Sequence, residues 1–351
     1  FQVAVPPPPS AANEFYVNSL LDSADAALGD GLVADAQGRA TLRAAIMEAN
    51  ARTGDERIFI PSGTISLSIA GTDEDAGATG DLDIASNIEI IGAGVDLSII
   101  DSATLDRVIQ VANGATVTLR GLTIRDGNVT GNGGGLSNAG VLHLIDVRVT
   151  GNTADGSGGG IVNSGTLRLV RTQVDNNSST SGAGGIHRAQ SDATPTLSLD
   201  TSVVSNNMGG EVGGIVNDGP LTITNSTIAD NVATTVVPSP TGPVGGFRNG
   251  LFNAATSVIA AVSASTISGN SATDGVGGLL NFGTLALTNS TISGNIGDAT
   301  GGIDSGSAPL ALVHVTVANN TGDEVGGVRG DAATVHNSII ATNVARTGSQ
   351  P

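Results

Sequence analysis

Carboxylates recur at one kind of place in this sequence, the short loop before a Gly-Gly pair, and they are its first candidates for metal chemistry. They are Asp155, Glu211, Asp274, Asp298, Asp323 and Glu324. If these loops were stacked, the oxygens could bind Ca²⁺, which prefers carboxylate and carbonyl ligands. The spacing matches neither an EF-hand loop nor a nonapeptide calcium repeat, so we interpret the residues as solvated loop charges. We predict no cofactor, and Ca²⁺ is the one ion that the pattern leaves open.

The chemistry of a polysaccharide-degrading enzyme is the second candidate. A lyase needs a basic group beside carboxylates that hold Ca²⁺, and a glycosidase needs two carboxylates close together. The 14 basic residues are all Arg and are scattered along the chain. Aromatic side chains, which usually form sugar subsites, occur within the repeats only at Phe247, Phe252 and Phe282. We find no Asp pair at matched positions of adjacent repeats, so no catalytic residue is predicted. A lyase or hydrolase stays as the alternative function.

Three weaker signals have structural explanations. The four histidines stand in different registers and lack ligand spacing, so we predict that they are surface residues: His143, His187, His314 and His336. The segment Ile91–Val95, Ile-Gly-Ala-Gly-Val, has no helix after it, so a turn explains it better than a dinucleotide loop does. A file of outward threonines could bind ice, but it is one residue wide, and strand propensity accounts for it. Its members are Thr227, Thr266, Thr291 and Thr316.

The sequence repeats predict the fold that positions the candidate residues. A unit of Gly-Gly-apolar, then Leu-x-Leu, then Val/Ile-x-x-Asn recurs eight times, clearest in Gly277–Asn295. The Gly-Gly pairs begin at Gly134, Gly159, Gly184, Gly213, Gly245, Gly277, Gly301 and Gly326. Apolar residues alternate within the middle piece, which indicates strands with one buried face. Three strands per repeat predict an all-β chain, a right-handed three-sided parallel β-helix. With three less regular coils before Gly134, the total is about eleven.

Asparagines punctuate these coils. One set closes the third strand of every repeat: Asn152, Asn177, Asn207, Asn231, Asn270, Asn295, Asn320 and Asn343. A second set follows the Gly-Gly pairs and is interrupted by Arg188 and Ser305: Asn138, Asn163, Asn217, Asn249 and Asn281. Asn tolerates left-handed turns, and stacked amides can hydrogen-bond along the axis. We therefore predict structural ladders, and leave a ligand-binding row of amides as the alternative.

A different segment precedes the coils. Residues 41–50 have the apolar spacing of a short helix, with Leu42, Ala45, Ile46 and Ala49 on one face and Thr41 as its N-cap. We expect this helix to cover the open end of the β-helix, whose free strand edges would otherwise aggregate. The predicted organisation is an N-terminal strand and Pro-rich spacer (1–12), a cap (13–56), the β-helix (57–343) and a tail (344–351).

Charge restricts the partners. The formal net charge is −18, which disfavours nucleic acid and anionic membranes. No apolar stretch is long enough to span a bilayer, so we expect no membrane insertion of this segment. Cysteine is absent, which excludes disulfides and thiolate metal sites.

Two resemblances add to this reading. Phe15–Ala51 resembles the N-terminal module of bacterial surface β-helix proteins of the CSLREX type. That module usually carries two cysteines, where this chain has Val33 and Ala40, so the family's disulfide is missing. The repeats are similar to those of polymorphic outer-membrane adhesins, with Val or Ile in place of the usual Phe. Both resemblances imply an exported protein at the cell surface, and neither supplies a catalytic residue.

The expected function is therefore that of a non-catalytic extracellular structural or adhesin-like protein. Its partner would be a cell-surface or matrix component, or a second copy of itself. Phe1–Val5 alternates like a strand, and Pro6–Pro9 holds it away from its own domain, whereas no cap follows Asn343. Addition of this strand to the next subunit would give a head-to-tail filament. The alternative is that Phe1–Ser10 is a linker trimmed from a longer protein.

Overall fold

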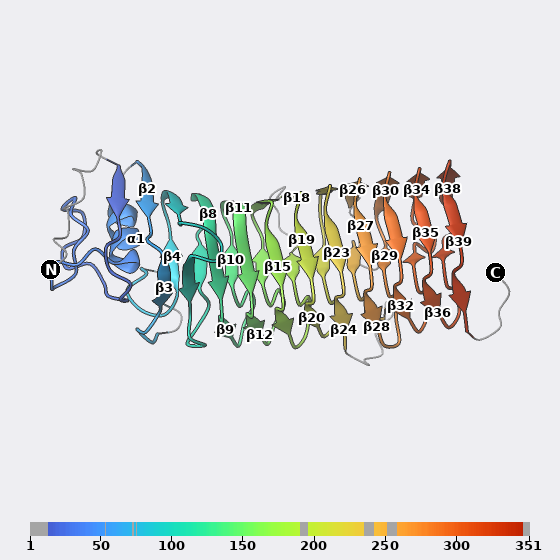
Figure 1. Cartoon of the computed structure of the whole chain (residues 1–351), viewed down its shortest axis with the longest axis horizontal. Helices are drawn as coiled ribbons and strands as arrows, with labels where there is room; N and C mark the ends of the chain where they lie inside the picture. The colour runs from blue at the N-terminus through green and yellow to red at the C-terminus, as the bar shows by residue number, and fades with distance from the viewer. Residues whose placement is uncertain are drawn as a thin grey trace.

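The computed structural model describes residues 13–52, 54–71, 74, 76–189, 196–234, 242–250 and 258–346. Its strands form three parallel sheets of 21, 10 and 9 strands that run along an elongated rod (Figure 1). Each strand pairs with the strand one repeat later, as in β29 (Leu279–Asn281) on β25 (Phe247–Asn249). The chain therefore winds as a three-sided parallel β-helix, and the predicted fold class is confirmed.

A typical coil contains four strands rather than the three pieces that the sequence indicates. After β29 come β30 (Thr284–Thr288), β31 (Thr291–Ser293) and β32 (Ile296–Gly297). Both β30 and β31 belong to the 21-stranded sheet, which bends between them. Strand β32 belongs to the 9-stranded sheet and is only two residues long, too short to show a periodic pattern. Sequence inspection missed this fourth strand for that reason.

Left-handed residues make the bends. In this coil Asn289 (φ 49°) separates β30 from β31, and Gly294 (φ 65°) precedes the turn into β32. Gly, Asn and Asp adopt this conformation at small cost, and they occupy many of these bends. At the bend equivalent to Asn289, other coils have Arg171, Thr201, Ala264 or His314, which also have positive φ. The bends recur in register along the rod and give it three flat faces.

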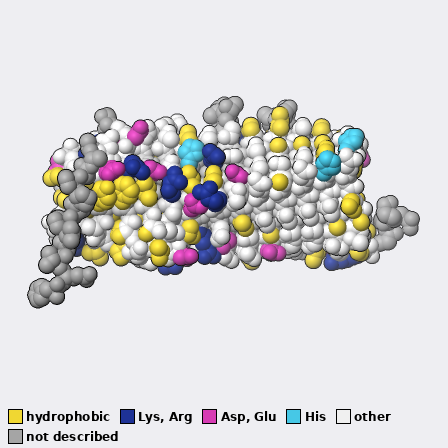
Figure 2. All heavy atoms as spheres, turned by 45° about the horizontal axis from the view of Figure 1, so that its top comes forward, with side chains coloured by type: hydrophobic (Ala, Val, Ile, Leu, Met, Phe, Trp, Pro, Cys, Tyr) yellow, Lys and Arg dark blue, Asp and Glu magenta, His cyan; other side chains and the backbone are white. Residues whose placement is uncertain are grey.

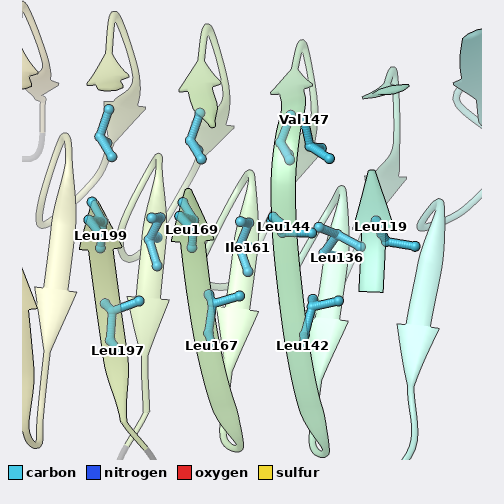
Figure 3. Packing of buried hydrophobic residues seen from close by; sticks show 14 of the residues in the cluster. Leu119, Leu136, Leu142, Leu144, Val147, Ile161, Leu167, Leu169, Leu197 and Leu199 are labelled. Carbon is cyan, nitrogen blue, oxygen red and sulfur yellow. The ribbon is translucent and has the colours of Figure 1, made fainter. Parts of the chain in front are cut away.

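The core consists of identical layers. Leu119, Leu144, Leu169 and Leu199 are partners in successive strands, and all are at most 1 % exposed. Figure 3 shows these side chains in rows that point into the coil. Each layer needs only a few branched side chains, so a chain with 2 % aromatic residues can bury a continuous core.

The closing asparagines form a buried ladder. From Asn152 to Asn343, each Nδ2 donates to the Oδ1 of the next coil's asparagine at 2.9–3.0 Å. The second set makes shorter runs, for instance Asn249 to Asn281 at 2.8 Å. Arg188 interrupts it: its guanidinium lies so close to Gly219 that a Cβ there would be 2.0 Å from Cζ. The ladder prediction is confirmed, including the break.

One helix, α1 (Leu42–Ala51), is described, and it packs on β2 (Asp55–Phe59) and β4 (Leu82–Ile84) at the N-terminal end of the rod. Thr41 Oγ1 accepts a hydrogen bond from Ala44 N, as expected of an N-cap. The predicted face of the helix joins the main core. Residues 1–12, which include the expected N-terminal strand, lie outside the described residues.

Eleven coils follow from this arrangement within the described residues. The first contains β2 and β3 (Gly63–Ser66), and each of the other ten begins with a strand of the 10-stranded sheet. The last consists of β37 (Val328–Arg329), β38 (Ala333–His336), β39 (Ile339–Ala341) and β40 (Val344–Ala345).

Candidate functional site

Among the described residues, nothing covers the core at the C-terminal coil. Val335 of β38 stacks on Leu312 and Ile340 of β39 stacks on Val317, at inward-facing positions. Leu312 and Val317 are fully buried, whereas Val335 is 46 % and Ile340 is 47 % exposed. Among the described residues, each strand of this coil pairs with the preceding coil only. This end therefore presents an apolar surface together with unpaired backbone groups, which are the features of a strand-addition site.

A band of paired charges covers the opposite half of the rod. The structure gathers several arginines that look scattered in the sequence on the outer face of the 21-stranded sheet (Figure 2). Arg57 and Arg120 share Glu89, Arg148 pairs with Asp175, and Arg171 with Asp146, at 2.7–3.4 Å. Exposed pairs of this kind contribute little to stability and leave few charges unmatched. The band is thus close to neutral and is a weak candidate for binding polyanions.

The file of threonines belongs to a wider surface than expected. Thr227, Thr266, Thr291 and Thr316 are strand partners in register, as predicted. From β22 (Leu221–Thr224) to β39, the strands of this sheet contain no Asp, Glu or Arg. The corresponding part of Figure 2 carries almost no charged side chains. The threonine file itself is one residue wide, as predicted, and the uncharged face around it is several residues wide.

The loop carboxylates mostly face arginines or backbone rather than one another. Glu211 pairs with Arg248, Glu324 with Arg329, and Asp298 accepts from Asp274 N. In the part of the chain that the structure describes, no three carboxylates or histidines are close enough to hold a metal ion. Their expected role as solvated charges stays a prediction.

The histidines differ from expectation in two cases. His314 and His336 are exposed, but His187 is partly buried with Nε2 3.7 Å from an oxygen of Asp218. His143 is also partly buried, and burial together with the charge of Arg168 lowers its pKa, so it is neutral near pH 7. His143 lies between Thr118 and Arg168 of the neighbouring strands, and His187 lies between Val162 and Val216.

Sequence inspection also missed a pair of carboxylates on adjacent coils. Asp81 directly precedes β4, and Asp106 lies shortly before β7 (Ile109–Val111), the strand that pairs with β4. Both line a cavity of about 710 Å³, together with Arg107. Burial raises the pKa of Asp81, and the charge of Asp106 raises it further. The pair precedes the regular repeats, where no periodic pattern aligns the two residues, so only the pairing of β4 with β7 could reveal it.

Comparison with known proteins identifies a similar fold but no family for this chain. No family model matches the sequence, and no curated protein matches it. Among solved structures, the pectate lyase Pel9A has a TM-score of 0.60 at 14 % identity, covering 94 % of this chain and 80 % of its own. The A-module of the Azotobacter vinelandii mannuronan C-5 epimerase AlgE6 (TM-score 0.46, 16 % identity) covers 94 % and 100 %. PfbA, a surface adhesin of Streptococcus pneumoniae (0.37, 10 %), covers 91 % and 93 %. At 14 % identity, the likeness to Pel9A shows the fold alone.

The structure was also compared with the requirements for a membrane-spanning helix. No helix among the described residues is both long and apolar enough to cross a bilayer.

Proposed function

We propose that this protein is a structural, adhesin-like rod outside the cell, and that its subunits join head to tail. The open C-terminal coil carries the proposal, because Val335 and Ile340 occupy core positions yet are nearly half exposed. Covering them would bury apolar surface and would pair the free edges of β38 and β39. The occupant we propose is Phe1–Val5 of a second copy.

The N-terminal residues suit that role chemically. Phe1, Val3 and Val5 alternate with Gln2 and Ala4, so a strand of this segment would place three apolar side chains on one face. The prolines that follow lack the N–H that a sheet needs, and a run of prolines is expected to form a stiff spacer. The surfaces at the two ends differ, so the contact is heterologous and does not close on itself. Contacts of this kind produce filaments.

The extracellular location rests on other observations. Phe15–Ala51 resembles a module of bacterial surface proteins, and the net charge of −18 suits a soluble, non-adsorbing rod. The partner along the sides of such a rod would be a surface or matrix component.

Electron microscopy and light scattering of three variants test the assembly. We expect the full chain to form filaments, whereas a deletion of residues 1–9 and the Ile340→Asp variant stay monomeric, because each removes one half of the contact. Thr291→Asp, an outward substitution on the side of the rod two coils before the last, should still polymerise and serves as the control. A full-length chain that remains monomeric at high concentration contradicts the proposal, as does an Ile340→Asp variant that still forms filaments.

Cross-linking tests which surfaces meet. The chain has no cysteine, so single substitutions report without background. A mixture of Val3→Cys and Ile340→Cys proteins should form a disulfide-linked dimer under mild oxidation, whereas Val3→Cys mixed with Thr291→Cys should not. Equal yields from both mixtures would show random collision and would refute the assigned contact.

The alternative, a polysaccharide-degrading enzyme, is favoured by one observation, the presence of Asp81 and Asp106 in a single cavity. Two neighbouring carboxyl groups can serve as the acid and the base that glycoside hydrolysis uses. Release of reducing ends from neutral polysaccharides, or of unsaturated products from acidic ones with added Ca²⁺, would establish this activity and replace the non-catalytic assignment.

A further inference from the structure

The cavity that contains Asp81 lies on the side of the rod, in the coils next to the N-terminal cap and far from the open C-terminal coil. It spans the coils that begin with β4, β7 and β10 (Leu136–Asn138), between strands of the 10-stranded and 9-stranded sheets. Its volume of about 710 Å³ falls within the range of small-molecule sites. Its lining combines carboxylates, amides, hydroxyls and apolar side chains.

Internal bonds hold the cavity in shape. Arg107 donates from Nη1 to Asp81 Oδ2 (3.0 Å) and Gln110 Oε1 (2.8 Å), and from Nε and Nη2 to the carbonyls of Gly133 and Asn132. The Glu74 carboxylate accepts backbone hydrogen bonds across the loop that precedes Asp81. Arg43 of the cap helix adds bonds to the carbonyls of Gly80 and Asp81. The site is therefore preorganised before any ligand binds.

The polar atoms of the cavity that are left to bind a ligand are mostly hydrogen-bond acceptors. Arg107 is the one cation among the described residues of the lining, and its guanidinium already donates hydrogen bonds to protein acceptors, so it offers little to an incoming anion. Asp81, Asp106 and Asp155 present carboxylate oxygens from different coils. They do not converge into a metal site among the described residues. A ligand that fits must therefore offer several hydrogen-bond donors spread over its surface, without negative charge.

We propose that this cavity binds a saccharide that lacks acidic groups. Its hydroxyls would donate to Asp81 and Asp106, while Thr104 and Thr130 can both donate and accept. Leu105, which is 44 % exposed, offers apolar surface to the face of a sugar ring. Three carboxylates repel a uronate, so neutral sugars are selected over acidic ones. This inference names a ligand for the adhesin-like role and is independent of head-to-tail assembly.

Isothermal titration calorimetry with three tetrasaccharides tests the inference, using N-acetylglucosamine, glucose and galacturonic acid as the repeating sugars. At least one neutral tetramer should bind, and tetragalacturonate should bind at least tenfold more weakly. The Asp81→Asn/Asp106→Asn double variant should weaken the neutral ligand at least tenfold, because amides replace the two acceptors. Asp331→Asn, on the exposed last coil, is the matched control and should bind as the parent does.

A cavity-filling variant keeps the test decisive if the double variant is unstable. Gly131 lines the cavity, and a Cβ added there would meet no atom within 4 Å. Gly131→Phe should therefore block binding while the thermal unfolding midpoint stays unchanged. The inference is overturned if no neutral tetramer binds at millimolar concentration, if tetragalacturonate binds most tightly, or if Gly131→Phe binds as the parent does. Filament formation by the same samples shows separately whether the proposed assembly holds.

Discussion

A single asparagine of the buried ladder satisfies several backbone and side-chain groups at once. Asn295 Oδ1 accepts from both N and Nδ2 of Asn270, and its own Nδ2 donates to Ile267 O and to Asn320 Oδ1. An amide side chain carries both the donor and the acceptor that this position needs. Asn295 is fully buried, so each of these bonds is costly to lose.

Replacement of Asn295 by Ala should lower the free energy of unfolding by at least about 2 kcal/mol, because buried donors and acceptors on both sides lose their partner. Urea denaturation followed by circular dichroism measures the change. Thr284→Ala, on the exposed face of the same coil, should change it by about 0.5 kcal/mol or less. Similar losses for the two variants would show that the ladder is not what stabilises the turn.

Glu56 is a carboxyl group at a position that later coils give to apolar side chains. It is the strand partner of Ile88, which in turn pairs with Val117. Its side chain is fully buried, and neither oxygen has a hydrogen-bond partner among the described residues. Arg52 Nε lies 3.8 Å from Oε1. Burial raises the pKa of Glu56, more than the opposing charge of Arg52 lowers it.

A raised pKa means that the folded chain holds this proton more tightly than the unfolded chain does. Glu56 therefore adds a stability that is complete below the ordinary Glu pKa and is lost as pH rises through the raised pKa. The Glu56→Gln variant has no titrating group here and should not lose this stability. The difference in thermal unfolding midpoint between variant and parent should therefore increase, in favour of the variant, from acidic to neutral pH. Thermal melts of both proteins across this range measure the difference. A constant difference at every pH would contradict a buried, titrating carboxyl.

At the scale of elements, the cap helix was predictable in outline and its anchoring was not. The run Leu42–Ala51 has strong helix formers, a local N-cap in Thr41 and an apolar stripe, all readable from neighbouring residues. Arg43, by contrast, is 1 % exposed and forms a bidentate pair with Asp22. Its other donors reach the carbonyls of Gly77, Gly80 and Asp81. These contacts join segments that share no sequence pattern.

Loss of the Arg43 side chain should uncouple the cap from the first coils. Arg43→Met leaves the buried Asp22 carboxylate without its cation, which costs about 3–5 kcal/mol when a buried pair is broken on one side. Arg329→Met, which removes the exposed pair with Glu324, should cost less than about 1 kcal/mol. Hydrogen exchange should show α1 losing protection first in Arg43→Met. Equal protection of α1 in both variants would mean that apolar packing alone holds the cap.

At the scale of the whole molecule, the features that could be predicted from the sequence are those of the regular repeats. The coils after Gly134 repeat the same positions, so their number, their ladders and three of their four strands follow from counting. The carboxylates Asp81 and Asp106 stand in coils of irregular length, where neither residue has a repeat to align it with the other. The exposed core at Val335 and Ile340 was foreseen only as an end without a visible cap. What lies on that end is a question for the assembly experiment.

The direction of pairing between coils has a mechanical consequence. Each coil is bonded to the next by parallel strands that run across the rod, so the backbone hydrogen bonds lie along its length. A pull on the two ends loads these bonds one coil at a time, like a zipper, and not all together. Each released coil of roughly 25 residues would lengthen the chain by about 80 Å, at about 3.4 Å per residue less the spacing of one coil. A filament of such rods would yield in steps and absorb work where a uniformly sheared structure would snap.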